Sequence, residues 1–170
     1  MILFILVSIT CMVHGQESKN NQLHFMDTVE LGNVWGRFKK ALKYRDIHTL
    51  HELSLKTVRC DIFQVADINR DYNPFISLDT FLSQFFHAQP KLKLWSVMNT
   101  KKYFIRVEQP YRFPQPNIKS KKGKQLVVYE IWYNTITPNE YGDGSEGMQN
   151  IFEFVKVGKN YKFFGLSSIP

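Results

Sequence analysis

The chain has 170 residues, of which 44% are hydrophobic and 15% aromatic, and its formal net charge is +7 at pH 7. A chain of this length makes about one domain and can bury a core unaided, which excludes a small scaffold that depends on disulfides or metal ions. So many aromatic side chains fill a core or line a cavity, and the positive charge favours either acidic partners or plain solubility.

Residues 1–15 are almost purely apolar, and no charged residue precedes Glu17. The segment is too short to span a bilayer as a helix, which needs roughly 20 residues, and it fits a cleavable secretory signal that is cut before Gln16. We therefore expect an exported protein, periplasmic or secreted, in which residues 16–27 form a flexible tether. A buried N-terminal strand and a lipoprotein anchored through Cys11 are the alternatives.

Apolar residues at helical spacing predict a first helix over residues 28–44 and a second, short helix over 46–55. Asp46 stands where it can cap the start of the second helix. His48 and His51 lie three residues apart there, but a metal site needs at least a third ligand, and none lies at a convincing spacing. We therefore predict neither a metal site nor a cofactor.

Residues 57–65 are dense in β-branched and aromatic side chains and predict a strand, followed by a polar connection over 67–74. Cys60 in this strand is the one cysteine left after signal cleavage, so no disulfide can form within the mature chain. It is interpreted as a small core residue or, alternatively, as a nucleophile, which would need a nearby His and an electropositive surrounding. Ser77 is placed to cap a third helix over 78–87.

The hydrophobic period shifts towards two beyond residue 91, which is typical of strands. We expect strands over residues 92–97, 103–108, 125–136, 151–157 and 161–167. The third of these is apolar on both faces, as is usual for a central strand. Gly158, Lys159 and Asn160 between the last two strands predict a hairpin turn.

Positive charge is densest in the run from Lys119 to Lys124, which follows a proline-rich stretch and is predicted to be a loop tip. It is either a contact for a phosphate or a lipid headgroup or an ordinary solvated loop. No nucleic-acid-binding module is recognisable, so we expect no nucleic-acid partner. We also expect no transmembrane segment.

The predicted order is helix, helix, strand, helix and then four or five antiparallel strands, which argues for an α+β fold. This order resembles the NTF2-like superfamily over residues 28–170. The opening helix pair is similar to the usual start of that family, through Phe38-Lys39-Lys40-Ala41-Leu42 with Leu50 and Leu53. The closing strands Phe152 to Val157 and Tyr161 to Leu166 resemble its usual end.

The resemblance implies a cone-shaped, strongly bent antiparallel sheet packed on about three N-terminal helices. It also implies a conical pocket open at one end. Enzymes of the superfamily place an Asp, His or Tyr in that pocket, whereas other members bind small ligands or use the open sheet face for dimers and partner proteins. The chain looks like the small exported bacterial members, and no catalytic residue of a family motif is carried over.

Two functions are expected from these patterns. The first is a non-catalytic exported module that binds a small apolar ligand or a protein partner, including a second copy through the sheet face. The second is a lyase or isomerase in which Glu130 or Asp61 acts as general base. Either function would use a pocket with apolar walls and few polar groups; the alternative is that these side chains are plain core and sheet surface. The candidate lining residues are Trp35, Phe38, Arg106, Tyr129, Trp132, Tyr133, Phe152 and Phe154.

Overall fold

The structure is a computed structural model that describes residues 27–62, 73–100, 102–108, 126–140, 142–144 and 146–169. The chain divides into two compact units, Met1–Lys40 and Ala41–Pro170. The predicted signal peptide, most of the predicted tether and the basic run from Lys119 to Lys124 lie outside the described residues. Within the described ranges, no helix combines the length and the apolar composition needed to cross a bilayer.

The first described element is a helix over residues 27–44, in agreement with the prediction. Arg45 ends it with a positive φ of 55°. The next helix, α2 (Ile47–Leu53), begins at once because Asp46 caps it: the Asp46 carboxylate accepts hydrogen bonds from the Thr49 backbone N–H (3.1 Å) and the Thr49 hydroxyl (2.7 Å). These bonds lower the pKa of Asp46 below its ordinary value.

The first strand, β1 (Ser54–Cys60), follows α2 without a loop and starts three residues before the predicted strand. Its partner β2 (Phe75–Ser77), which the sequence did not reveal, pairs with it in antiparallel orientation. Helix α3 (Leu78–Ala88) begins where predicted, with the Ser77 hydroxyl accepting from the Thr80 backbone N–H at 3.1 Å. One face of α3 buries Leu78, Phe81, Leu82 and Phe85.

The predicted strand over residues 92–97 is wrong. The chain forms a 3₁₀ turn, η1 (Gln89–Lys91), and then a short helix, α4 (Lys93–Asn99). Leu94 and Met98 are its buried residues, four positions apart on one helical face. An alternating pattern and a helical pattern coincide over so few residues, so periodicity alone could not separate them.

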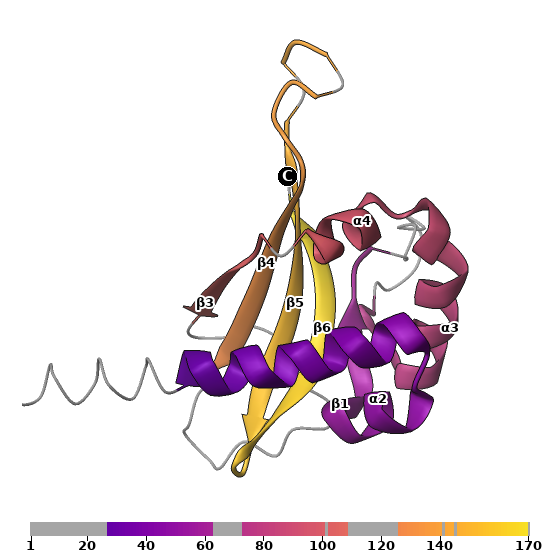
Figure 1. Ribbon diagram of the computed structural model, residues 1–170, viewed down its shortest axis with the longest axis vertical. Helices are drawn as coiled ribbons and strands as arrows, with labels where there is room; N and C mark the ends of the chain where they lie inside the picture. The colour runs from indigo at the N-terminus through magenta and orange to yellow at the C-terminus, as the bar shows by residue number, and fades with distance from the viewer. Residues whose placement is uncertain are drawn as a thin grey trace, which may run out of the picture. The chain divides into compact units, whose positions relative to one another are not determined.

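The remaining strands confirm the prediction for the C-terminal half. They are β3 (Phe104–Glu108), β4 (Val128–Ile136), β5 (Met148–Val157) and β6 (Asn160–Ile169). Each pairs antiparallel with the next, and the last two form the predicted hairpin, with Gly158 at a φ of 63° in its turn. Figure 1 shows β4, β5 and β6 side by side.

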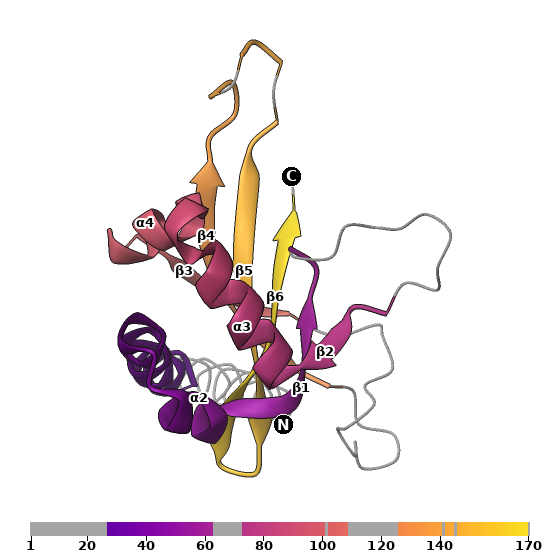
Figure 2. The ribbon, with the colours of Figure 1, turned by 90° about the vertical axis from the view of Figure 1, so that its right-hand side faces the viewer.

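The sheet is mixed rather than antiparallel throughout, which corrects the expected architecture. Its strand order is β2-β1-β6-β5-β4-β3, and β1 runs parallel to β6. The parallel pair places the strand that follows α2 beside the C-terminal strand, as Figure 2 shows from the side of α3. The result is an open α+β fold in which the helices precede most of the sheet in the chain.

The two faces of the sheet carry different side chains, because neighbouring residues of a strand point to opposite faces. The face covered by α3, here called the aromatic face, holds rings from β4, β5 and β6. Phe163 is central to it, with ring centroids 5.2 Å from Phe81 of α3, 5.8 Å from Phe154 and 6.3 Å from Phe152. Tyr133 continues this cluster from β4, 6.2 Å from Phe152.

Candidate functional site

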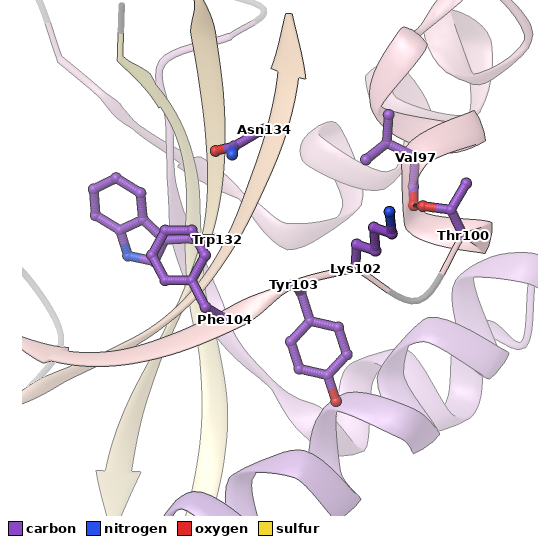
Figure 3. A pocket seen from close by; sticks show the side chains of 7 residues that line it. All are labelled: Val97, Thr100, Lys102, Tyr103, Phe104, Trp132 and Asn134. Carbon is purple, nitrogen blue, oxygen red and sulfur yellow. Dashed lines mark hydrogen bonds between the residues drawn. The ribbon is translucent and has the colours of Figure 1, made fainter. Parts of the chain in front are cut away.

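A cleft of about 620 Å³ lies where α4 and the start of β3 meet β4. Figure 3 shows the side chains that form it. Helix α4 and the residues after it contribute one side, and the ends of β3 and β4 contribute the other. The lining residues are Val97, Thr100, Lys102, Tyr103, Phe104, Trp132 and Asn134.

One wall of the cleft is a stacked pair of rings. Phe104 and Trp132 are directly opposite in the β3–β4 ladder, and their ring centroids are 5.5 Å apart with an interplanar angle of 23°. The guanidinium carbon of Arg106 lies 4.9 Å from the Trp132 ring centroid. The indole N–H donates to Glu130 Oε2 at 2.8 Å, so the orientation of Trp132 is held by polar contacts. Phe104 remains 43% exposed and offers its ring to the cleft.

The polar groups of the cleft are few. The Thr100 hydroxyl donates to the Val97 carbonyl at 2.8 Å, which closes the end of α4. Asn134 Oδ1 accepts from the Gln149 side chain at 2.9 Å. Lys102 is exposed and brings the one cationic side chain among the lining residues.

The predicted lining residues fall into three groups. Trp132 lines the cleft. Arg106 is not a lining residue but lies over the indole ring of Trp132. The predicted residues of the aromatic face are buried among other rings: Tyr129, Tyr133, Phe152 and Phe154. The last two candidates, Trp35 and Phe38, lie on the N-terminal helix, with ring centroids 6.0 Å apart.

Sequence reasoning missed most of the cleft. Tyr103 and Phe104 were assigned to a strand without a role, and Val97 was placed in a strand that does not exist. Thr100 and Lys102 lie between the predicted strands 92–97 and 103–108 and carried no predicted role. The one available signal was the pair of adjacent aromatic residues at the start of an edge strand, where large rings are not needed for a core.

The face of the sheet opposite the aromatic face carries a row of charged residues, here called the charged row. Successive partners across five strands are Arg59 on β1, Gly165 on β6, Glu153 on β5, Glu130 on β4 and Arg106 on β3. Directly opposite residues share one face of a sheet, so these side chains form a line across it.

Gly165 leaves room for Arg59 and Glu153 to meet at the centre of this row. A Cβ atom there would lie 2.7 Å from Arg59 Cβ and 3.0 Å from Glu153 Oε2. With hydrogen in its place, Arg59 Nη1 reaches across β6 to Glu153 Oε1 at 2.9 Å. The β5–β6 ladder shifts register beside this point, so that Phe164 is inserted as an extra residue of β6, and both Phe164 and Gly165 lie on the face of the charged row.

Glu153 is the most buried charged residue described, with 2% of its surface exposed. Its Oε1 also accepts from the Ser167 hydroxyl at 2.8 Å, while Oε2 has no hydrogen-bond partner. Burial raises the pKa of this carboxyl to about 7, against the opposing effects of Arg59 and Ser167; Glu130 and Asp61 add to the rise. Arg59 is shared, since its Nη2 lies 2.5 Å from Asp61 Oδ2.

The two expected general bases, Asp61 and Glu130, do not line the cleft and have polar partners instead of an apolar pocket around them. Asp61 is paired with Arg59, and Glu130 accepts from the Trp132 indole. The carboxyl with the chemistry of a base, Glu153, was not singled out from the sequence, where it is one of several charged residues in a strand.

His48, His51 and Cys60 are not among the residues that line the cleft. His48 pairs with Glu52 at 3.2 Å and His51 with Asp79 at 2.8 Å, and Cys60 is buried in β1. Over the described ranges, no group of three or more His, Cys, Asp or Glu side chains is placed to hold a metal ion.

No protein-family model matches the chain, and no curated protein matches it either.

Proposed function

We propose that the protein is an exported binding module of the NTF2-like kind that takes a small apolar ligand into the cleft between α4, β3 and β4. The observation that carries this proposal is a cleft of about 620 Å³ with exposed aromatic side chains among its lining residues. Ligand sites are usually concavities of this size range, with apolar walls and a few polar groups. Tyr103 and Phe104 are 36% and 43% exposed, which leaves apolar surface for a ligand to cover.

The architecture supports the family part of this proposal. The described order agrees in part with the order on which the resemblance rests: two helices, strands, α3 and a run of antiparallel strands are present, whereas α4 replaces the predicted strand over 92–97 and β1 runs parallel to β6. The export part rests on the apolar segment 1–15 and is tested by N-terminal sequencing of the protein from culture supernatant or periplasm. A mature N-terminus at Gln16 would support it, and an intact Met1 would overturn it.

Binding is tested by isothermal titration calorimetry of the full chain with 2-naphthalenemethanol, a neutral aromatic probe. We expect saturable binding that is weakened about tenfold by Phe104→Ala, because this substitution removes one ring of the stacked pair. Val157→Ala is the matched control, since Val157 is similarly exposed (45%) and does not line the cleft. Equal binding by both variants, or no saturable binding, would overturn the proposal.

A second function, acid–base catalysis, is favoured by one observation. Glu153 is a buried carboxyl whose pKa is raised to about 7 and whose Oε2 atom accepts no hydrogen bond, and both are properties of a general base. It is tested by NMR measurement of deuterium exchange at carbon atoms next to the carbonyl of apolar ketones. Exchange that the wild type catalyses and Glu153→Gln does not would establish this role; exchange at the uncatalysed rate with both would exclude it.

A further inference from the structure

We propose that the cleft selects ligands in which a flat aromatic ring system is joined to a negatively charged group, such as an aromatic carboxylate. This inference rests on the proposed binding function and adds the chemical class of the ligand. Two separate features of the lining lead to it: the geometry of the rings and the sign of the charge.

The ring pair favours a flat ligand. Phe104 and Trp132 are nearly parallel, and Arg106 and Glu130 hold the indole in place through the contacts described above. Because aromatic rings prefer offset stacking or edge contacts, a pair with one exposed ring presents a surface that a planar group can extend. Figure 3 shows this pair at one side of the cleft, with Tyr103 set apart from it.

The charge of the lining favours an anion. Lys102 makes no hydrogen bond or ion pair with any residue in the described part of the chain, and the lining contains no carboxylate. Glu130, two residues from Trp132 in β4, already accepts from the Trp132 indole. A ligand that fills the cleft would shield Lys102 in part from water, and an uncompensated buried charge is costly. A negative group on the ligand removes that cost.

Asn134 adds a second donor on the β4 side. Its Oδ1 accepts from Gln149, whereas its amide N–H₂ group donates to no residue in the described part of the chain and belongs to a side chain that lines the cleft. An ammonium and an amide N–H₂ group together are donors that suit a carboxylate. Neither can accept a hydrogen bond from a cationic ligand.

The test compares three probes that share a naphthalene ring and carry groups of different charge: 2-naphthoate, 2-naphthalenemethanol and 2-naphthylmethylammonium. Each is titrated into the full chain at pH 7.5, with isothermal titration calorimetry as the readout. We expect the carboxylate to bind about fivefold more tightly than the alcohol, as one partly exposed ion pair allows. The ammonium probe should bind more weakly than the alcohol, and raising the salt concentration should reduce only the preference for the carboxylate.

Lys102→Met should lower the affinity for 2-naphthoate to that of the alcohol and leave the alcohol affinity unchanged. Lys159→Met is the matched control, because it removes the same charge from the β5–β6 turn, outside the cleft. Equal affinity for all three probes, or an equal loss in both Lys variants, would overturn the charge inference while the binding function stands. No binding of any probe would overturn both.

Discussion

The two faces of the sheet are equally buried near its centre but are built from different chemistry. On the aromatic face, Phe163 lies among rings from α3 and from β5. On the charged face, at the neighbouring positions of the same strands, Glu153 and Arg59 meet over Gly165. Six successive residues of β5, Asn150 to Val155, are buried, so both faces are shielded along this strand.

The comparison shows that burial and apolar composition are separate properties. A buried ring needs only close packing. A buried carboxylate needs partners for its charge and its hydrogen bonds, and Glu153 has partners at one oxygen only. The aromatic face should therefore supply most of the stability, whereas the charged face should make that stability depend on pH.

The largest expected effect is the loss of a ring from the aromatic face. Phe163→Ala removes a fully buried side chain that contacts three rings, one on α3 and two on β5, and it should lower the free energy of unfolding by about 4 kcal/mol. Urea denaturation measures this change. Phe104→Ala, which removes an exposed ring, should cost less than about 1 kcal/mol. Similar losses from the two substitutions would contradict the assignment of the core to the aromatic face.

The charged face is tested most directly at its glycine. Gly165→Ala would place a methyl group 2.7 Å from Arg59 Cβ and 2.9 Å from the Arg59 carbonyl oxygen, so backbone must move. We expect a loss of about 3 kcal/mol in urea denaturation. Gly36→Ala, on the exposed side of the N-terminal helix, should instead stabilise by up to about 1 kcal/mol. A neutral Gly165→Ala would show that the two strands do not approach as described.

Glu153 should make stability fall as pH rises. The folded protein keeps this proton up to about pH 7, whereas the unfolded chain releases it near 4.5, so the folded state binds more protons between these values. The free energy of unfolding should therefore decrease between about pH 4.5 and 7, by at most about 3 kcal/mol. Urea titrations at several pH values measure the slope.

Glu153→Gln should flatten that slope, because the amide can still accept from Ser167 and Arg59 keeps Asp61 as its partner. Glu146→Gln, at an exposed position, controls for the change in net charge. If the free energy of unfolding of Glu153→Gln depends on pH as steeply as that of the wild type, groups other than Glu153 cause the dependence.

The smallest expected effect concerns the helix that covers the aromatic face. Ser77→Ala removes the side-chain acceptor at the start of α3 and should cost about 1 kcal/mol in urea denaturation. Ser77→Asp restores an acceptor and should recover most of the loss. A neutral Ser77→Ala would mean that packing of Phe81 and Phe85 alone holds the helix end.

Local patterns predicted much of the fold but little of the site. The cap at Ser77, the hairpin at Gly158 and the C-terminal strands depend on residues a few positions apart, and each was predicted correctly. The short helix α4 was missed because seven residues do not distinguish the two hydrophobic periods. That error hid the cleft, since α4 provides one of its sides.

By itself, the sequence determined the first three helices and the antiparallel strands β3 to β6, because capping and periodicity act over a few residues, but it did not determine α4 or β2. Only the tertiary structure decided that β1 runs parallel to β6 and that Arg59 meets Glu153, 94 residues later in the chain. It also decided that Lys102 and the Trp132 ring border one cleft. These juxtapositions depend on strand order and register, which follow from the packing of the whole sheet rather than from any local pattern.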